Sequence, residues 1–201
     1  MQYFEYGEAE IQYLKSKDKR LGEAIDRIGP IQREVIPNLF EALVNCIVGQ
    51  QISMKAVDTI WNRILLWFGA VTPERMLSVS AEKLQKVGIS MRKAQYIQNI
   101  ARMVQNGSFR MDELDTLSDG EVAERLSALN GVGVWTAEML MIFSMQRKNI
   151  LSWDDLAIRR GIMKLYHHRS LDKDRFEKYR RRYAPYGSVA SLYLWEISLQ
   201  K

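Results

Sequence analysis

The chain has 201 residues, of which 47% are apolar and 26% charged, a balance typical of a folded protein with one medium domain or two small lobes. The net charge of +5 favours an anionic partner, most often nucleic acid, and no run of about 18 apolar residues indicates a membrane span. The first residues are too acidic and polar for a signal peptide, and the single cysteine, Cys46, excludes an intrachain disulfide or a four-cysteine iron–sulfur site.

Helical signals follow one another along the chain, and no segment shows the alternation typical of a strand. A helix should begin at Thr72–Glu74, where a capping residue, a proline and an acid occur in succession. A capping box at 118–121 begins another helix, whose apolar residues up to Leu129 share one face. The segment 135–145 is apolar nearly all round and should be buried. Apolar residues recur at helical spacing from Asp155 and again near the C-terminus, so we predict an all-α protein.

A glycine turn, Gly131–Gly133, joins two of these helices, and glycine suits such a reversal because it tolerates positive φ. The turn differs from a dinucleotide-binding fingerprint, since a helix precedes it and Thr136 replaces the third glycine. The first amides of the following helix lie at the positive end of its dipole, where phosphate binds readily. A plain hairpin that binds nothing fits the turn equally well. LQKVGISMRKA, at 84–94, is a similar segment and predicts a second hairpin-like turn.

Four segments in register resemble a known family. LNGVGVWTAEML, at 129–140, resembles the helix-hairpin-helix of the DNA glycosylase superfamily, and WDDLAIRRG, at 153–161, supplies the aspartate that follows it there. VNCIVGQQISMKAV, at 44–57, is similar to the helix-turn-helix that carries the DNA wedge in the 3-methyladenine DNA glycosylase II branch. RRYAPYGSVASLYLW, at 181–195, resembles the closing helix of that branch.

The resemblance implies one glycosylase unit over 1–201, built of two helical lobes with an active-site cleft between them. Residues 37–151 would form the middle lobe, and residues 1–36 and 152–201 the other. The implied activity is that of a monofunctional enzyme that excises alkylated purines of the 3-methyladenine type in base excision repair. Lyase-competent relatives carry a Schiff-base lysine just after the hairpin, where this chain has Trp135. No cofactor or iron–sulfur cluster is expected.

By the same resemblance, Asp155 is the catalytic carboxylate. Cleavage of an N-glycosidic bond builds positive charge on the sugar, which a carboxylate stabilises while it orients the attacking water. Alkylated purines already carry positive charge, so the base leaves without a strong general acid. Judged on its own segment, Asp155 could instead complete a capping box with Ser152, and the two roles can coexist. Asp154 is expected to cap the helix or to brace the loop.

A base must flip out of the duplex to be reached, and something must fill the gap. Gln51 is the expected wedge, with Gln50 beside it, although many relatives use an apolar residue and a polar helix end is the alternative. Trp135, Tyr183 and Trp153 are the expected aromatic faces of the pocket, where stacking and cation–π attraction hold a cationic base. Each of these aromatic residues would serve equally well in the core.

The expected contacts with DNA phosphates are Gly131, Val132, Gly133, Thr136 and Lys93, with the exposed arginine run 180–182 as a further candidate. The resemblance implies a structural Na⁺ or K⁺ on the backbone carbonyls of Ser127, Leu129 and Val132. The expected partner is double-stranded DNA with damaged bases, bound by a monomer in a nucleus or a nucleoid-containing cytoplasm. Two other functions stay open: a non-catalytic helix-hairpin-helix DNA-binding module, and a glycosylase for another lesion such as hypoxanthine or uracil.

Overall fold

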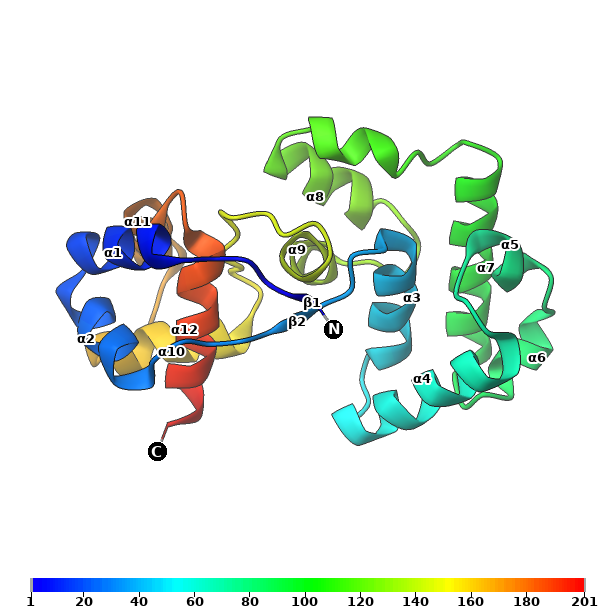
Figure 1. The fold of residues 1–201 in the computed structure, drawn as a ribbon, viewed down its shortest axis with the longest axis horizontal. Helices are drawn as coiled ribbons and strands as arrows, with labels where there is room; N and C mark the ends of the chain where they lie inside the picture. The colour runs from blue at the N-terminus through cyan, green and yellow to red at the C-terminus, as the bar shows by residue number, and fades with distance from the viewer. Residues whose placement is uncertain (1, 201) are drawn as a thin grey trace. The chain divides into compact units, whose positions relative to one another are not determined.

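The computed structural model describes residues 2–200, and almost all of its regular structure is helical, which confirms the predicted all-α class (Figure 1). The chain divides into two compact units. The middle unit is Ile36–Leu140, and the terminal unit combines the residues up to Val35 with those from Met141 onward. The second boundary lies at Leu140 rather than at the expected Leu151. The reason is packing: helix α9 continues past this boundary, and Phe143 near its end stacks on Trp195 at 5.5 Å.

The middle unit contains most of the helices of the described chain. They are α3 (Leu39–Gly49), α4 (Met54–Phe68), α5 (Pro73–Leu77), α6 (Ala81–Gln85), α7 (Met91–Gln105), the 3₁₀ helix η1 (Asp112–Thr116), α8 (Asp119–Ser127) and the first turns of α9 (Val134–Phe143). Helices α3 to α8 each begin at a Ser, Thr or Asn whose side chain accepts a hydrogen bond from the amide three residues on. The predicted starts at Thr72 and Ser118 are therefore confirmed.

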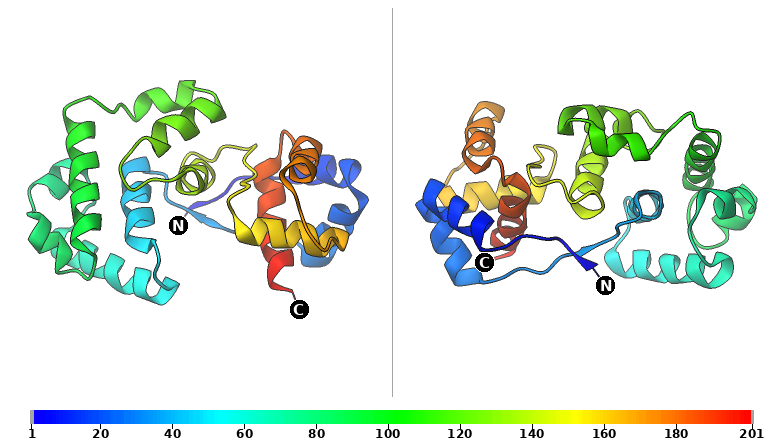
Figure 2. Two further views of the ribbon diagram at one scale, coloured as in Figure 1. Left: turned by 180° about the vertical axis from the view of Figure 1, so that it is seen from behind. Right: turned by 45° about the horizontal axis from the view of Figure 1, so that its top comes forward.

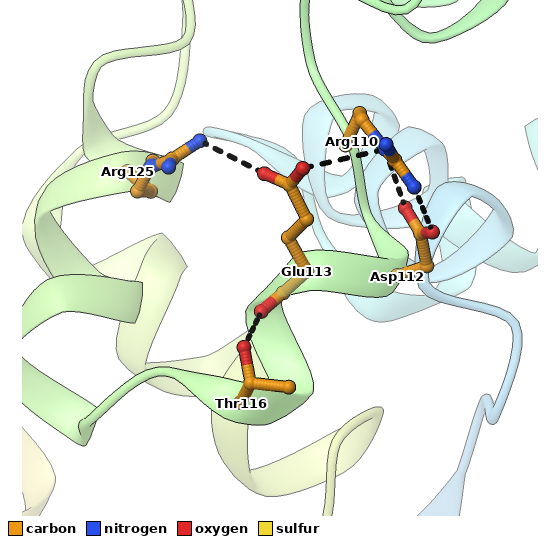
Figure 3. Close-up of polar contacts among 5 residues, drawn as sticks. All are labelled: Arg110, Asp112, Glu113, Thr116 and Arg125. Atoms are coloured by element: carbon orange, nitrogen blue, oxygen red, sulfur yellow. Dashed lines mark hydrogen bonds and ion pairs between the residues drawn. The ribbon is translucent and has the colours of Figure 1, made fainter.

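A small polar cluster ties η1 to α8, the helix that leads into the glycine turn (Figure 3). Glu113 lies between Arg110, at 3.4 Å, and Arg125 on α8, at 3.7 Å. Arg110 also pairs with Asp112 at 2.7 Å, and the Thr116 hydroxyl donates to the Glu113 carbonyl at 2.8 Å. All of these side chains are exposed, and exposed ion pairs contribute little to stability. The cluster therefore links η1 to α8 but adds little to the stability of the fold.

The terminal unit contains the remaining helices and one short ribbon. Its elements are α1 (Glu8–Lys17), α2 (Lys19–Ile28), α10 (Leu156–Tyr166), α11 (Lys173–Tyr183), α12 (Gly187–Leu199), and the antiparallel strands β1 (Gln2–Tyr3) and β2 (Glu34–Val35). The ribbon was not predicted, because strands of two residues are too short to show an alternating pattern. No helix in residues 2–200 is long and apolar enough to cross a membrane.

Helices α10 and α12 cross, as Figure 2 shows, and their backbones approach closely at Gly161. A Cβ atom at Gly161 would lie 2.2 Å from the carbonyl oxygen of Leu194, so only glycine fits at this crossing. Around it, Ile158 and Ile162 are fully buried. This crossing fixes the position of α10, whose first turn holds Asp155.

Candidate functional site

The glycine turn of the middle unit forms the predicted helical hairpin. Two backbone hydrogen bonds close it, from the Leu129 amide to the Leu126 carbonyl at 3.1 Å and from the Val132 amide to the Leu129 carbonyl at 3.0 Å. The first helical bond of α9 runs from the Ala137 amide to the Gly133 carbonyl at 2.9 Å. The amides of Gly133 and Val134 thus precede the first intrahelical hydrogen bond of α9, at the positive end of its dipole.

The two glycines of this turn are required for different reasons. Gly131 has φ +89°, and a Cβ there would lie 2.4 Å from the Tyr96 ring, so the fold itself demands glycine. Gly133 is exposed, its φ is not in the left-handed region, and a Cβ would meet no atom of the described chain within 4 Å. Packing does not require a glycine at 133, whereas a ligand that approaches the backbone closely would explain it.

The loop between α3 and α4 separates the roles of the two glutamines. Gln51 is exposed and has φ +59°, a left-handed conformation that costs a residue with a Cβ roughly 1–2 kcal/mol. Gln50 is half-buried, and its side-chain Nε2 donates to the Gly131 carbonyl at 2.7 Å. Gln51 therefore projects from the loop, while Gln50 ties the loop to the hairpin turn.

Lys93, an expected phosphate contact, is engaged inside the middle unit. Its half-buried ammonium donates to the carbonyls of Val48 at 2.9 Å and Gln50 at 2.7 Å, at the C-terminal end of α3. Burial lowers the pKa of Lys93 from its ordinary value. The structure thus gives this side chain a supporting position under the Gln51 loop rather than a place on the open surface.

The first turn of α9 presents one of the predicted aromatic residues. Trp135 is 44% exposed, so part of its indole is available to a ligand. Thr136 is only 6% exposed, so its expected contact with DNA, which stays a prediction, would be made by its backbone. Val132 is likewise buried, so its contribution to a ligand site is limited to its backbone.

Asp155 caps α10 in the terminal unit. Its Oδ1 accepts a hydrogen bond from the Ile158 amide at 2.9 Å, and the residue is 7% exposed. The alternative interpretation is right that Asp155 caps its own helix, but because the helix begins at Leu156 and Ser152 is fully buried before it, Ser152 does not begin a capping box. Of the two roles expected for Asp154, the cap is excluded because Asp155 occupies it, and bracing of the loop stays a prediction for this exposed residue. The cap places the Asp155 carboxylate at the positive end of the α10 dipole.

The other two expected pocket aromatics lie in the terminal unit. Trp153 is half-buried, with an edge contact to Phe176 at 5.2 Å and the Arg159 guanidinium 4.8 Å from its ring centre. Tyr183 is 0% exposed, and its hydroxyl lies 2.6 Å from that of Tyr166. A ring without an exposed face offers nothing for a base to stack on, so the expected substrate contact of Tyr183 is corrected to a core position.

A buried carboxylate that the sequence reasoning missed explains much of the arginine run. Asp18 accepts hydrogen bonds from the Tyr166 hydroxyl and from Arg182, both at 2.6 Å. Burial acts to raise the pKa of Asp18, but hydrogen bonds from Tyr166, the Leu21 amide and Arg182 outweigh it and lower that pKa. Arg180 donates to the Leu151 carbonyl at 2.8 Å. Two of the three arginines at 180–182 therefore hold the fold together.

The comparisons with known proteins agree with this arrangement. Residues 44–185 match the model of the HhH-GPD superfamily of base excision DNA repair proteins. DNA-3-methyladenine glycosylase 1 of Schizosaccharomyces pombe is 30% identical over 200 residues, which cover 95% of this chain and 86% of that protein. The structure of a DNA-3-methyladenine glycosidase from Bacillus halodurans matches with a TM-score of 0.87 at 36% identity, covering 100% of this chain and 94% of the other.

A second solved structure, the S. pombe 3-methyladenine DNA glycosylase in complex with abasic DNA, matches with a TM-score of 0.80 at 29% identity. That match covers 94% of this chain and 96% of the other. The family match spans more than half of the sequence and includes the hairpin, the Gln51 loop and Asp155. This chain belongs to the HhH-GPD superfamily of base excision DNA repair proteins.

Proposed function

We propose that this protein is a monofunctional DNA glycosylase that hydrolyses the N-glycosidic bond of alkylated purines of the 3-methyladenine type, as a step of base excision repair. The observation that carries the proposal is Asp155, a buried carboxylate held by the first turn of α10 within the segment 44–185 that matches the family. The named glycosylase relatives support the substrate class. A protein that only binds DNA would need this residue only as a helix cap, for which asparagine or serine would serve as well as a carboxylate. Its place of action is the nucleus or the nucleoid.

The chemistry follows from where charge develops. As the base departs, the sugar gains oxocarbenium character, which the Asp155 carboxylate stabilises while it orients or deprotonates the attacking water. The Ile158 amide holds one carboxylate oxygen in place, so little reorganisation is needed when the positive charge appears. A cationic base such as 3-methyladenine leaves without a strong general acid. Among the expected aromatic residues, Trp135 is the exposed one that suits stacking on this base.

The middle unit supplies the proposed contacts with DNA. The backbone at Gly133 and Val134 suits a phosphate, because its amides precede the helical ladder and no Cβ stands at 133. The carbonyls of Ser127, Leu129 and Val132 would hold a Na⁺ or K⁺ through hard oxygen donors, and its positive charge would attract a phosphate. Leu129 also accepts the Val132 amide, and a carbonyl oxygen has a second lone pair for a cation. Gln51 is the proposed wedge.

The absence of a lysine after the hairpin turn predicts the products. A duplex with one methylated purine should yield the free base, and the strand should stay intact until alkali or heat breaks it, because Trp135 has no amine for imine formation. The measurement is chromatography of the released base together with denaturing electrophoresis of the strand. A covalent DNA adduct trapped by borohydride on the wild-type protein would contradict the assignment.

A substitution of Gln51, in the strained loop between α3 and α4, is expected to have opposite effects on stability and activity. Gln51→Gly should raise the stability of the fold by about 1 kcal/mol or less, because glycine removes the left-handed strain while the unfolded chain gains entropy. The same change removes the proposed wedge, so excision from paired DNA should slow. Thermal unfolding and single-turnover excision test both parts. An activity equal to wild type would assign the wedge to another residue.

A further inference from the structure

The second hairpin-like segment, 84–94, forms the α6–α7 turn, but its turn is not an open phosphate site. Gly88 has φ +114°, and the position of a Cβ there would be 3.3 Å from Ile60 of α4. Arg63 of α4 donates to the Val87 carbonyl at 3.2 Å. Side chains of α4 therefore cover this turn, unlike the turn at Gly133. Its function must lie in what the start of α7 contacts.

We propose that Lys93 and Tyr96, one turn apart on α7, are positioning residues that hold the Gln51 loop and the hairpin turn as one rigid platform for opening DNA. The inference rests on the proposed function, since the wedge and the phosphate contact are assigned there. Lys93 fixes the loop: its ammonium binds the Val48 and Gln50 carbonyls, where the dipole of α3 favours a cation. Tyr96 fixes the hairpin, because its ring fills the space next to Gly131.

Gln50 joins the two halves of this platform. Its backbone carbonyl accepts from Lys93 at 2.7 Å, and its side-chain amide donates to the Gly131 carbonyl at 2.7 Å. Arg92, also in the first turn of α7, donates to the Tyr96 hydroxyl and stacks over its ring. The loop and the turn, far apart in sequence, thus share one support in the middle unit.

The platform explains how Gln51 keeps its left-handed conformation. Such strain persists only when the surrounding structure determines the backbone at several points. Here the loop is held on the Gln50 side by Lys93, while Ser53 caps α4 on the other side of Gln51. Without the ammonium, the end of α3 loses its anchor and Gln51 relaxes. A mobile wedge residue cannot displace a stacked base from its pair. Its mobility matters little where the base is already unpaired, because less energy is needed to flip that base.

The test compares Lys93→Met with two reference variants. Lys93→Arg keeps donors for both carbonyls, and Lys83→Met removes the same charge from an exposed position on α6. Single-turnover excision of one methylated purine is measured in two duplexes. In one the purine is paired, and in the other it lies opposite an abasic site. Hydrogen exchange of the amides at 49–53 is measured in the free protein, with melting temperatures as a check on folding.

We expect Lys93→Met to slow excision from the paired duplex roughly tenfold or more beyond its effect on the unpaired lesion, because only the paired base needs a firm wedge. Hydrogen exchange at 49–53 should be faster in Lys93→Met than in wild type. Lys93→Arg should recover much of the excision rate and of the slow exchange, and Lys83→Met should match wild type in both. Equal slowing on both substrates, or unchanged exchange, would overturn the proposal. If the wild-type protein excises neither substrate, the proposed function fails instead. The hydrogen-exchange data then still decide whether Lys93 holds the platform. Should Lys93→Met not fold, Gln50→Ala, which removes only the link to Gly131, is expected to show the same dependence on pairing.

Discussion

Asp155→Asn is expected to lower the single-turnover excision rate on the order of 10²-fold or more, with little change in melting temperature or DNA affinity. The carboxylate stabilises a charge that exists fully only in the transition state, so its loss affects the rate far more than binding. The cap survives, because asparagine accepts the Ile158 amide as well as aspartate does. Any change in DNA affinity should be toward tighter binding, because loss of a negative charge relieves repulsion with phosphates.

Asp154→Asn is the matched control, since Asp154 is an exposed neighbour that does not cap α10. It should lose much less activity. Asp155→Ala removes the cap as well as the charge, so it should lose activity and about 1 kcal/mol of stability together. An Asp155→Asn enzyme near wild-type speed beside an inactive Asp154→Asn enzyme would move the catalytic assignment by one residue. If both variants stay fast, the proposed mechanism fails.

Gly133→Val is expected to weaken binding to duplex DNA of any sequence by roughly 10- to 100-fold. One charge-assisted hydrogen bond from a backbone amide to phosphate contributes about 1.5–3 kcal/mol, and a branched side chain at 133 would prevent that approach. Phosphate contacts read no bases, so the loss should not depend on sequence. The folded protein has room for the side chain, and stability should fall by about 1 kcal/mol or less.

Gly131→Ala is the contrasting variant, because its Cβ would overlap the Tyr96 ring at a residue with positive φ. Strain and overpacking should cost it about 2 kcal/mol or more of stability. Fluorescence anisotropy with two unrelated duplexes and thermal unfolding of both variants separate the effects. Unchanged affinity in a well-folded Gly133→Val protein would remove the hairpin from the DNA contacts.

Local patterns predicted the features that depend on neighbouring residues. The helix starts at Thr72 and Ser118 and the hairpin at Gly131–Gly133 follow from capping and backbone conformation, which a few residues determine. The glycine pattern alone did not distinguish its two members. Gly131 faces Tyr96, and Gly133 faces open space, a difference that only tertiary packing decides.

Features that depend on distant partners could not be predicted in this way. Tyr183 is in the core because its hydroxyl pairs with that of Tyr166 on α10, and Tyr166 in turn contacts Asp18 between α1 and α2. Lys93 is drawn under the Gln51 loop by carbonyls more than forty positions before it in the chain. The positive φ of Gln51 has no sequence signature, because the residue is neither glycine nor asparagine.

The most direct test of the central claim is the identity of the bases that the protein releases from methylated DNA. Wild-type protein is incubated with duplex DNA that carries radiolabelled methyl groups, and the soluble products are separated by chromatography. We predict free 3-methyladenine in the wild-type reaction, an intact strand, and almost no release by Asp155→Asn at the same protein concentration. Retention of all label in the DNA by a wild-type protein that binds the duplex would contradict this prediction, and would favour a binding module without catalysis.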